Sequence, residues 1–158
     1  MGKCCSLEKV AMGDRQLFHL AIPITDPVVA KKFYAEALGC AVGRENSGAV
    51  IFNFFGHQLV AHVTHEPLTA QHGIYPRHFG MTFLDEQDWQ TVLERAEKYE
   101  LKFRDRPRLR FPGQLTEHRT FFLEDPFFNL LEFKWYRHPE AIFGGRGLTE
   151  IGDRPETR

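Results

Sequence analysis

The chain has 158 residues, of which 42% are hydrophobic and 26% charged, a composition typical of one globular domain with its own core. Its net charge of -1 argues against a dedicated nucleic-acid-binding protein, and no apolar run approaches the roughly 18 residues of a membrane helix. Three cysteines, two of them adjacent, cannot form a disulfide framework and fit a reducing compartment such as the cytoplasm.

Residues 1–15 are expected to be a flexible leader without a secretory signal, because residues 1–14 lack an apolar core. Gly2, followed by Cys4 and Cys5, matches the pattern for N-myristoylation with palmitoylation nearby. The alternative is a leader that carries no lipid. We expect no contact with a membrane unless this leader is lipidated.

Residues 16–63 predict a βαβββ module. Alternating apolar residues predict a strand over residues 17–24, which carries His19 on one face. Asp26 is a predicted N-cap, and apolar residues at helical spacing continue to Gly39, which ends the helix. Three further strands, separated by turn residues, are expected at residues 40–42, 49–55 and 57–63.

Residues 64–76 are a polar connector, and residues 77–136 predict a second βαβββ module. A strand over residues 77–84 precedes Asp85, which caps the second predicted helix. Further strands are expected at residues 101–104 and on both sides of Asp125-Pro126, with a loop at residues 106–114. Residues 139–158 are expected to be a mobile tail, or alternatively to cover a partner subunit.

The two halves repeat one another. Each has a histidine seven residues before a helix-capping aspartate, His19 in the first half and His78 in the second. An alignment of the last strands places Glu132 over Ala61. The sequence therefore predicts an α+β fold in which two βαβββ modules form a cupped mixed sheet, and His19, His78 and Glu132 can converge on one point.

Glu132 is a carboxylate within an aromatic-rich strand, and burial of an unpaired carboxylate is costly, so it needs a cation, a hydrogen-bond partner or water. Together with His19 and His78 it would form the facial triad of a divalent metal, which leaves positions for substrate and for water or oxygen. The alternative is that each histidine is a hydrogen-bonded, half-buried strand residue. No cysteine is placed to join these residues, which argues against a structural zinc site.

His118 is a candidate general acid or base, because it shares a predicted strand face with Phe122 and histidine titrates near neutral pH. A surface histidine at a strand entrance is the alternative. His57 is expected to share a face with Ala61 and to line the open side of the metal, whereas Gln58 faces the other way.

Arginines alternate through the predicted loop before the penultimate strand, and Arg108 and Arg110 are expected to lie nearest the pocket. Such a row could guide a carboxylate or phosphate substrate, because guanidinium groups match those anions. The alternative is a solvated sheet edge that discourages pairing with other strands.

The motifs Arg77-His78-Phe79-Gly80 and Phe122-Leu-Glu-Asp125-Pro126-Phe-Phe-Asn129-Leu-Leu-Glu132-Phe resemble those of the vicinal oxygen chelate superfamily. This superfamily includes glyoxalase I, bleomycin-resistance proteins, fosfomycin-resistance transferases and extradiol dioxygenases. The resemblance covers roughly residues 16–138. It is specific for the fold and the metal position and weak for the reaction.

The resemblance implies a metal held by His19, His78 and Glu132 and a small-molecule substrate bound through adjacent oxygens. Iron(II) is favoured, with manganese(II), nickel(II), cobalt(II) and zinc(II) as alternatives. Ala61 stands where the four-ligand glyoxalase I type has a glutamate, and Phe122 stands where extradiol dioxygenases of the catechol type usually have a tyrosine.

We therefore expect a homodimeric enzyme with a dioxygenase-like activity on a small oxygen-bearing aromatic substrate, in which Phe122 lines the substrate site. One alternative is a glyoxalase-like lyase or isomerase, or a fosfomycin-type thiol transferase. The other is a metal-free protein that sequesters an aromatic ligand, for which fifteen phenylalanines would suit a cleft.

Overall fold

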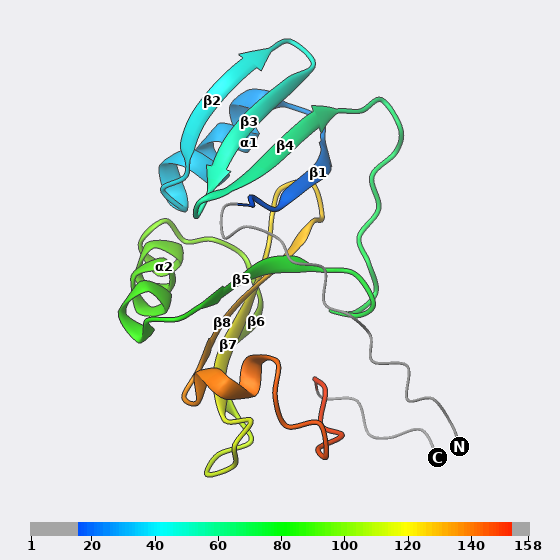
Figure 1. Cartoon of the computed structure of the whole chain (residues 1–158). Coiled ribbons are helices and arrows are strands. Elements are labelled where there is room, and N and C mark those ends of the chain that lie inside the picture. Colours follow the sequence, from blue (N-terminus) through cyan, green and yellow to red (C-terminus); the bar gives the residue numbers. More distant parts are fainter. Residues whose placement is uncertain (1–15, 153–158) are drawn as a thin grey trace, which may run out of the picture.

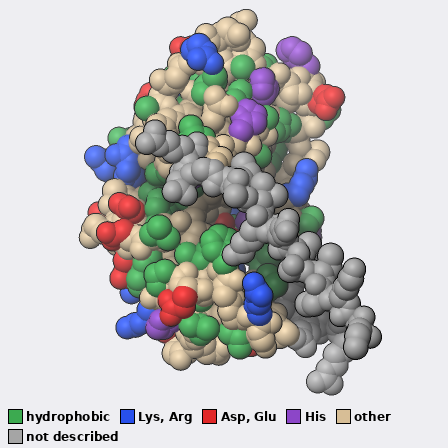
Figure 2. All heavy atoms as spheres, viewed as in Figure 1, with side chains coloured by type: hydrophobic (Ala, Val, Ile, Leu, Met, Phe, Trp, Pro, Cys, Tyr) green, Lys and Arg blue, Asp and Glu red, His purple; other side chains and the backbone are tan. Residues whose placement is uncertain are grey.

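The computed structural model describes residues 16–152, which form two four-stranded mixed sheets, one above the other in Figure 1. The lipidation motif at Gly2, Cys4 and Cys5 lies outside the described residues. Within residues 16–152 no helix is both long and apolar enough to cross a membrane. Figure 2 shows charged side chains of both signs spread over the viewed face, as the small net charge would suggest.

The first sheet has the strand order β1-β4-β3-β2, in which β1 runs parallel to β4 and the other pairs are antiparallel. Asp26 caps the helix, because its Oδ1 accepts hydrogen bonds from the backbone N–H groups of Val28 (2.7 Å) and Val29 (3.3 Å). The elements are β1 (His19–Ile24), α1 (Pro27–Lys31), a π-helical turn η1 (Lys32–Ala37), β2 (Ala41–Asn46), β3 (Ala49–Phe54) and β4 (His57–Val63).

The second sheet repeats this arrangement in the order β5-β8-β7-β6, so the predicted α+β fold of paired βαβββ modules is confirmed. The predicted loop at residues 106–114 is wrong in its first part, because residues 106–110 belong to β6 and pair with β7. The elements are β5 (Phe79–Phe83), α2 (Glu86–Lys98), β6 (Phe103–Arg110), β7 (His118–Glu124), β8 (Leu130–Tyr136) and a short 3₁₀ helix η2 (Pro139–Ile142).

Phenylalanines from both modules meet in one continuous core. The ring of Phe54 on β3 lies 5.7 Å from that of Phe79 on β5 and 6.3 Å from that of Phe133 on β8, measured between ring centroids. Phe55 makes similar contacts with Phe83 at 5.4 Å. Many phenylalanines therefore hold the modules together, and their number does not by itself indicate a ligand cleft.

A buried polar network also joins the modules. The hydroxyl of Tyr34 on η1 donates a hydrogen bond of 2.7 Å to Oδ2 of Asp125, which lies in the turn before β8. Asn129 Nδ2 donates to the same carboxylate oxygen at 2.8 Å and to the carbonyl of Pro23 at 3.2 Å. Because both modules supply buried polar groups to this network, it fixes how β8 and Glu132 lie relative to the first module.

Candidate functional site

Glu132 on β8 is the centre of the site, and its side chain is only 6% exposed. Its Oε1 accepts a hydrogen bond of 2.7 Å from the hydroxyl of Thr120 on β7. Its Oε2 lies 3.2 Å from Nε2 of His78 and 3.5 Å from Nζ of Lys134, while Arg110 Nη1 approaches Oε1 to 3.9 Å. The buried carboxylate is thus surrounded by one hydroxyl and three groups that are or can become cationic, as its burial requires.

His78, just before β5, is held with Nε2 toward Glu132. Its Nδ1 donates a hydrogen bond of 2.8 Å to the carbonyl of Ile74, and the ring of Phe122 packs edge-on against the imidazole at 5.1 Å. Gly80 lies directly beside Glu132 in the parallel β5–β8 pair, and a Cβ there would come 1.7 Å from the Glu132 carbonyl oxygen. A glycine at this position therefore lets the two strands that carry His78 and Glu132 lie close together.

The protonation of this pair follows from these contacts. Burial alone would raise the pKa of Glu132, but the hydrogen bond from His78, the charge of Lys134 and the Thr120 hydroxyl outweigh it and lower the pKa to about 2. The hydrogen bond to Glu132 raises the pKa of His78, despite the opposing effect of burial. Without a metal, the His78–Glu132 hydrogen bond therefore favours an ionised Glu132 beside a protonated His78.

The site opens into a cavity of about 500 Å³. The side chains that line it include Tyr75, His78, Arg110, His118, Glu132, Lys134 and Tyr136. Residues between 141 and 152, which follow β8, form the opposite wall. The structure thus brings four of the residues predicted for the site, His78, Arg110, His118 and Glu132, to one cavity.

His118 on β7 is 5% exposed and stacks on Tyr136, with 4.7 Å between ring centroids. Its Nδ1 donates a hydrogen bond of 2.8 Å to the carbonyl of Thr116. Burial lowers the pKa of His118, and the charges of Arg110 and Lys134 lower it further, against the raising effect of the Thr116 carbonyl. His118 is therefore neutral near pH 7, with Nε2 as the nitrogen that can accept a proton.

His19 is not brought to this cavity. It is exposed at the start of β1, in the other sheet, and its Nδ1 lies 2.7 Å from Oε1 of Gln58. Among the described residues, no three histidine, cysteine, aspartate or glutamate side chains are grouped closely enough to hold a metal ion. Within one chain, then, the expected convergence of His19 with His78 and Glu132 is not found.

The register of β4 also differs from the prediction. In the parallel β1–β4 pair His19 lies beside Gln58 and Ala21 beside Val60, so Gln58 and Val60 share the face of His19. The expectation that His57 lines this open face and Gln58 points away is wrong, because the strand pairing is offset by one residue from the repeat alignment. The counterpart of Glu132 is Val60 instead of Ala61, and it too cannot bind a metal.

Two other predicted substrate-site residues lie beside the cavity without lining it. Arg108 on β6 forms an ion pair of 2.7 Å with Asp105, and its side chain is 38% exposed. Phe122 is 1% exposed and lies beneath the imidazole of His78 and the guanidinium of Arg110, 6.0 Å from the latter. Phe122 therefore positions His78 and Arg110. It is not among the residues that line the cavity, so the predicted direct contact with substrate is not found there.

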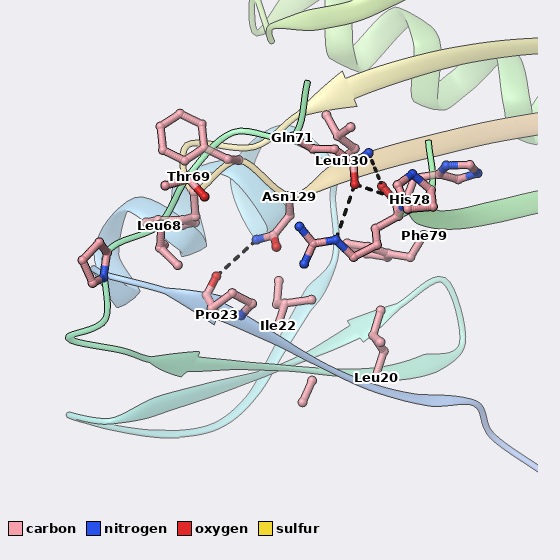
Figure 3. Close-up of a pocket in the computed structure, with 16 residues that line it drawn as sticks. Leu20, Ile22, Pro23, Leu68, Thr69, Gln71, His78, Phe79, Asn129 and Leu130 are labelled. Atoms are coloured by element: carbon pink, nitrogen blue, oxygen red, sulfur yellow. Dashed lines mark hydrogen bonds between the residues drawn. The ribbon is translucent and has the colours of Figure 1, made fainter. Parts of the chain in front are cut away.

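A second cavity, of about 570 Å³, lies between the two modules beneath the connector at residues 64–76. Figure 3 shows its labelled lining residues, with Leu20, Ile22 and Pro23 on β1 and with Asn129 hydrogen-bonded to the carbonyl of Pro23. His78 lines this cavity as well as the one over Glu132. The histidine therefore lies between the two spaces.

Sequence reasoning missed the contacts that Thr120, Lys134 and Tyr75 make in the site. Thr120 and Lys134 could have been found from the strand pattern, because alternation places them on the faces of His118 and Glu132 respectively. Tyr75 lies in the connector, where no periodic pattern predicts the direction of a side chain. The same is true of residues 141–152.

The fold and the site together define a protein built from duplicated βαβββ modules with a histidine and a glutamate on adjacent strands of one sheet. The sequence model of the Glyoxalase/Bleomycin resistance protein/Dioxygenase superfamily matches residues 16–133. The chain belongs to this superfamily, whose structures share the vicinal oxygen chelate fold. A search of curated proteins gives no significant match.

Solved structures agree with this assignment. A glyoxalase/bleomycin resistance protein/dioxygenase from Alicyclobacillus acidocaldarius is 39% identical, with a TM-score of 0.76 over 81% of this chain and 96% of that chain. The fosfomycin resistance protein FosX from Listeria monocytogenes is 16% identical, with a TM-score of 0.61 over 80% and 98%. A lactoylglutathione lyase from Agrobacterium tumefaciens is 18% identical, with a TM-score of 0.59 over 84% and 98%. The last two likenesses concern the fold alone.

Proposed function

We propose that this chain is a metal-dependent enzyme of the superfamily and that His78 and Glu132 supply two of the metal ligands. The observation that carries the proposal is that Nε2 of His78 and Oε2 of Glu132 lie 3.2 Å apart, while Ile74 holds the other imidazole nitrogen and Thr120 the other carboxylate oxygen. Metal-binding histidines usually donate their second ring N–H to a carbonyl or carboxylate, and ligating carboxylates are themselves hydrogen-bonded. The ammonium of Lys134 would have to turn away from Glu132, which its 29% exposed side chain permits.

The third ligand in this proposal is the partner subunit's His19 in a homodimer. The residues His19, Ala21 and Pro23 on β1 are exposed and lie on one face of the first sheet. The matching face of the second sheet carries His78 and Glu132. A twofold dimer that packs the first sheet of one chain over the second sheet of the other would cover this face and complete two equal sites.

A divalent metal, iron(II) in the first instance, would supply a Lewis acid that binds adjacent substrate oxygens. Arg110 and Lys134 place two positive charges at the cavity, so they would bind and orient an anionic substrate oxygen. Tyr75 and Tyr136 give the cavity aromatic walls, which suit a substrate ring. These features support a dioxygenase-like activity on a small aromatic compound with adjacent, ionisable oxygens.

Neutral His118 favours a second candidate, a lyase or isomerase that moves a proton. A buried imidazole with a lowered pKa can take a proton from a bound substrate at neutral pH. The two candidates differ in their need for oxygen. A dioxygenase consumes oxygen when iron(II) and substrate are both present, whereas a lyase, an isomerase or a thiol transferase needs the metal without oxygen.

The first test is metal content after anaerobic purification and reconstitution with iron(II). We expect about one metal per chain in the wild type and loss of the metal in His78→Ala, Glu132→Ala and His19→Ala. His62→Ala is the matched control, because His62 is exposed and shares the His19 face on β4. Absence of metal from the wild type, or equal metal in every variant, would refute the proposal and favour a metal-free binding protein.

Mixed dimers test the shared site. If the partner subunit's His19 completes the site, co-refolding His19→Ala with Glu132→Ala chains should restore about a quarter of the wild-type metal content. Half of the dimers are then mixed, and each mixed dimer has one intact site out of two. Co-refolding His78→Ala with Glu132→Ala chains should restore none, since both residues belong to the same half-site. Equal recovery in the two mixtures would exclude the shared arrangement.

A further inference from the structure

The chain continues beyond β8 and folds back over the site. Figure 1 shows this segment, drawn from orange to red, turning back beside the end of the second sheet. It starts with η2 and runs to Gly152, and it supplies the wall of the cavity that faces His78, His118 and Glu132. The superfamily match ends at residue 133, before this segment begins. Residues 139–152 therefore follow the part of the chain that the family model matches, and they meet the site directly.

The segment is attached at two points. At its start, η2 buries Ala141, which is 7% exposed, and the N–H of Gly144 bonds to the carbonyl of Glu140 at 2.9 Å. At its end, Gly152 abuts the side chain of Tyr75, whose hydroxyl would lie 2.2 Å from a Cβ at this position. Tyr75 itself lines the cavity.

Between these two points the segment has little packing of its own. The side chain of Phe143 is 94% exposed and that of Ile151 is 86% exposed. The hydrogen bond from Leu148 N–H to the Gly145 carbonyl, 2.7 Å long, closes only a local turn. A segment with few buried apolar contacts opens at low free-energy cost, so loss of the contact at either end should loosen it.

We propose that residues 139–152 form the substrate-selecting wall of the cavity and that the contact between Gly152 and Tyr75 keeps this wall closed. The inference rests on the proposed function, in that the substrate is taken to bind beside His78 and Glu132. With the wall closed, residues 141–152 limit the space beside His78 and Glu132, so a single-ring anionic aromatic compound should bind more tightly than a bulkier fused-ring compound with the same adjacent oxygens. With the wall released, this size selection weakens while the metal ligands are unchanged.

The test compares full-length Gly152→Ala with Gly147→Ala. At residue 152 the backbone has φ +64° and an added Cβ would collide with Tyr75, so alanine should detach the end of the wall. At residue 147, in the same segment, an added Cβ would meet nothing within 4 Å. The second variant therefore makes the same chemical change without breaking the attachment.

Hydrogen exchange, measured by mass spectrometry on the metal-free proteins, gives the first readout. In Gly152→Ala, peptides from residues 139–152 should exchange about tenfold faster than in the wild type. In Gly147→Ala they should exchange as in the wild type. Equal exchange in all three proteins would overturn the proposal. This readout needs no metal, so it is independent of the proposed enzyme function.

Binding of two probes gives the second readout, with 4-nitrocatechol as the single-ring compound and 2,3-dihydroxynaphthalene as the fused-ring compound. The wild type and Gly147→Ala should bind 4-nitrocatechol more tightly than 2,3-dihydroxynaphthalene. In Gly152→Ala the ratio of the two dissociation constants should fall about fivefold. An unchanged preference in Gly152→Ala, or a wild type that binds neither probe, would overturn the proposal. Metal content measured on the same samples separates this failure from failure of the metal site.

Discussion

Replacement of Thr120 by valine should destabilise the protein through the loss of one hydrogen bond to Glu132. The Thr120 side chain is fully buried, and its hydroxyl lies 2.7 Å from Glu132 Oε1. A hydrogen bond to a charged group contributes about 1.5–3 kcal/mol, and the added methyl group returns at most about 0.8 kcal/mol. We therefore expect the free energy of unfolding at pH 7 to fall by about 1–2 kcal/mol.

Thr116→Val is the matched control for this substitution. The Thr116 hydroxyl is buried, and among the described residues it has no hydrogen-bond partner. Removal of an unsatisfied buried hydroxyl should leave stability unchanged or raise it. Urea denaturation followed by tryptophan fluorescence measures both variants, and equal destabilisation by the two substitutions would refute the assigned role of the Thr120–Glu132 bond.

The same bond has a pH signature. Glu132 has a pKa of about 2 in the folded protein, below its ordinary value of 4.5, so its stabilising contribution is complete above pH 4.5 and is lost as the pH falls toward 2. In Thr120→Val the pKa of Glu132 should rise toward the ordinary value. The acid-induced loss of stability between pH 4.5 and 2 should therefore be smaller in this variant than in the wild type. An identical pH dependence in both would contradict this account.

Three further predictions concern other buried or charged groups. Tyr34→Phe removes the 2.7 Å bond to the buried Asp125 carboxylate and should lower the free energy of unfolding by about 2 kcal/mol, whereas an unchanged urea midpoint would contradict the inter-module network. Lys134→Gln removes the ammonium 3.5 Å from Glu132 and should tighten manganese(II) binding, measured by calorimetry, by about tenfold, while weaker binding would argue against a metal there. Burial raises the pKa of Cys40 to about 12, so iodoacetamide at pH 8 should label Cys40 only in urea. Peptide mass spectrometry separates this site from Cys4 and Cys5, and rapid labelling of Cys40 in the native protein would show that its thiol is accessible.

The fold could be predicted because its signals are local and repeated. Asp26 and Asp85 each cap a helix in the structure as expected, and each follows a strand that begins at a histidine or directly after one. Alternation along β7 placed His118 on the face of Phe122, and the β7–β8 register puts Glu132 beside Phe122. Such patterns depend only on the geometry of single strands and helices.

The errors arose where a position depends on distant partners. The arginine-rich residues 106–110 look like a loop, yet they form a strand because β7 satisfies their backbone hydrogen bonds, and Pro107 is tolerated since β6 lies at the edge of the sheet. The face of His57 was assigned wrongly because one residue of offset in the pairing of β4 reverses every side chain. The separation of His19 from Glu132 reflects how the two sheets lie relative to one another, which no local pattern encodes.

The charges around Glu132 connect the metal, the substrate and the cavity wall. One carboxylate is opposed by Lys134 and by Arg110, so the metal-free site is already positive, and the hydrogen bond to Glu132 also raises the pKa of His78. A divalent metal would replace the proton on His78 and add a further positive charge to a site that is 6% exposed at Glu132. Burial of this excess positive charge is costly, and an anionic ligand would offset it. The metal and the anion should therefore each strengthen binding of the other. This reciprocity favours an ionised, oxygen-bearing substrate over a neutral one, and a closing wall would increase the effect by keeping water away from the charges.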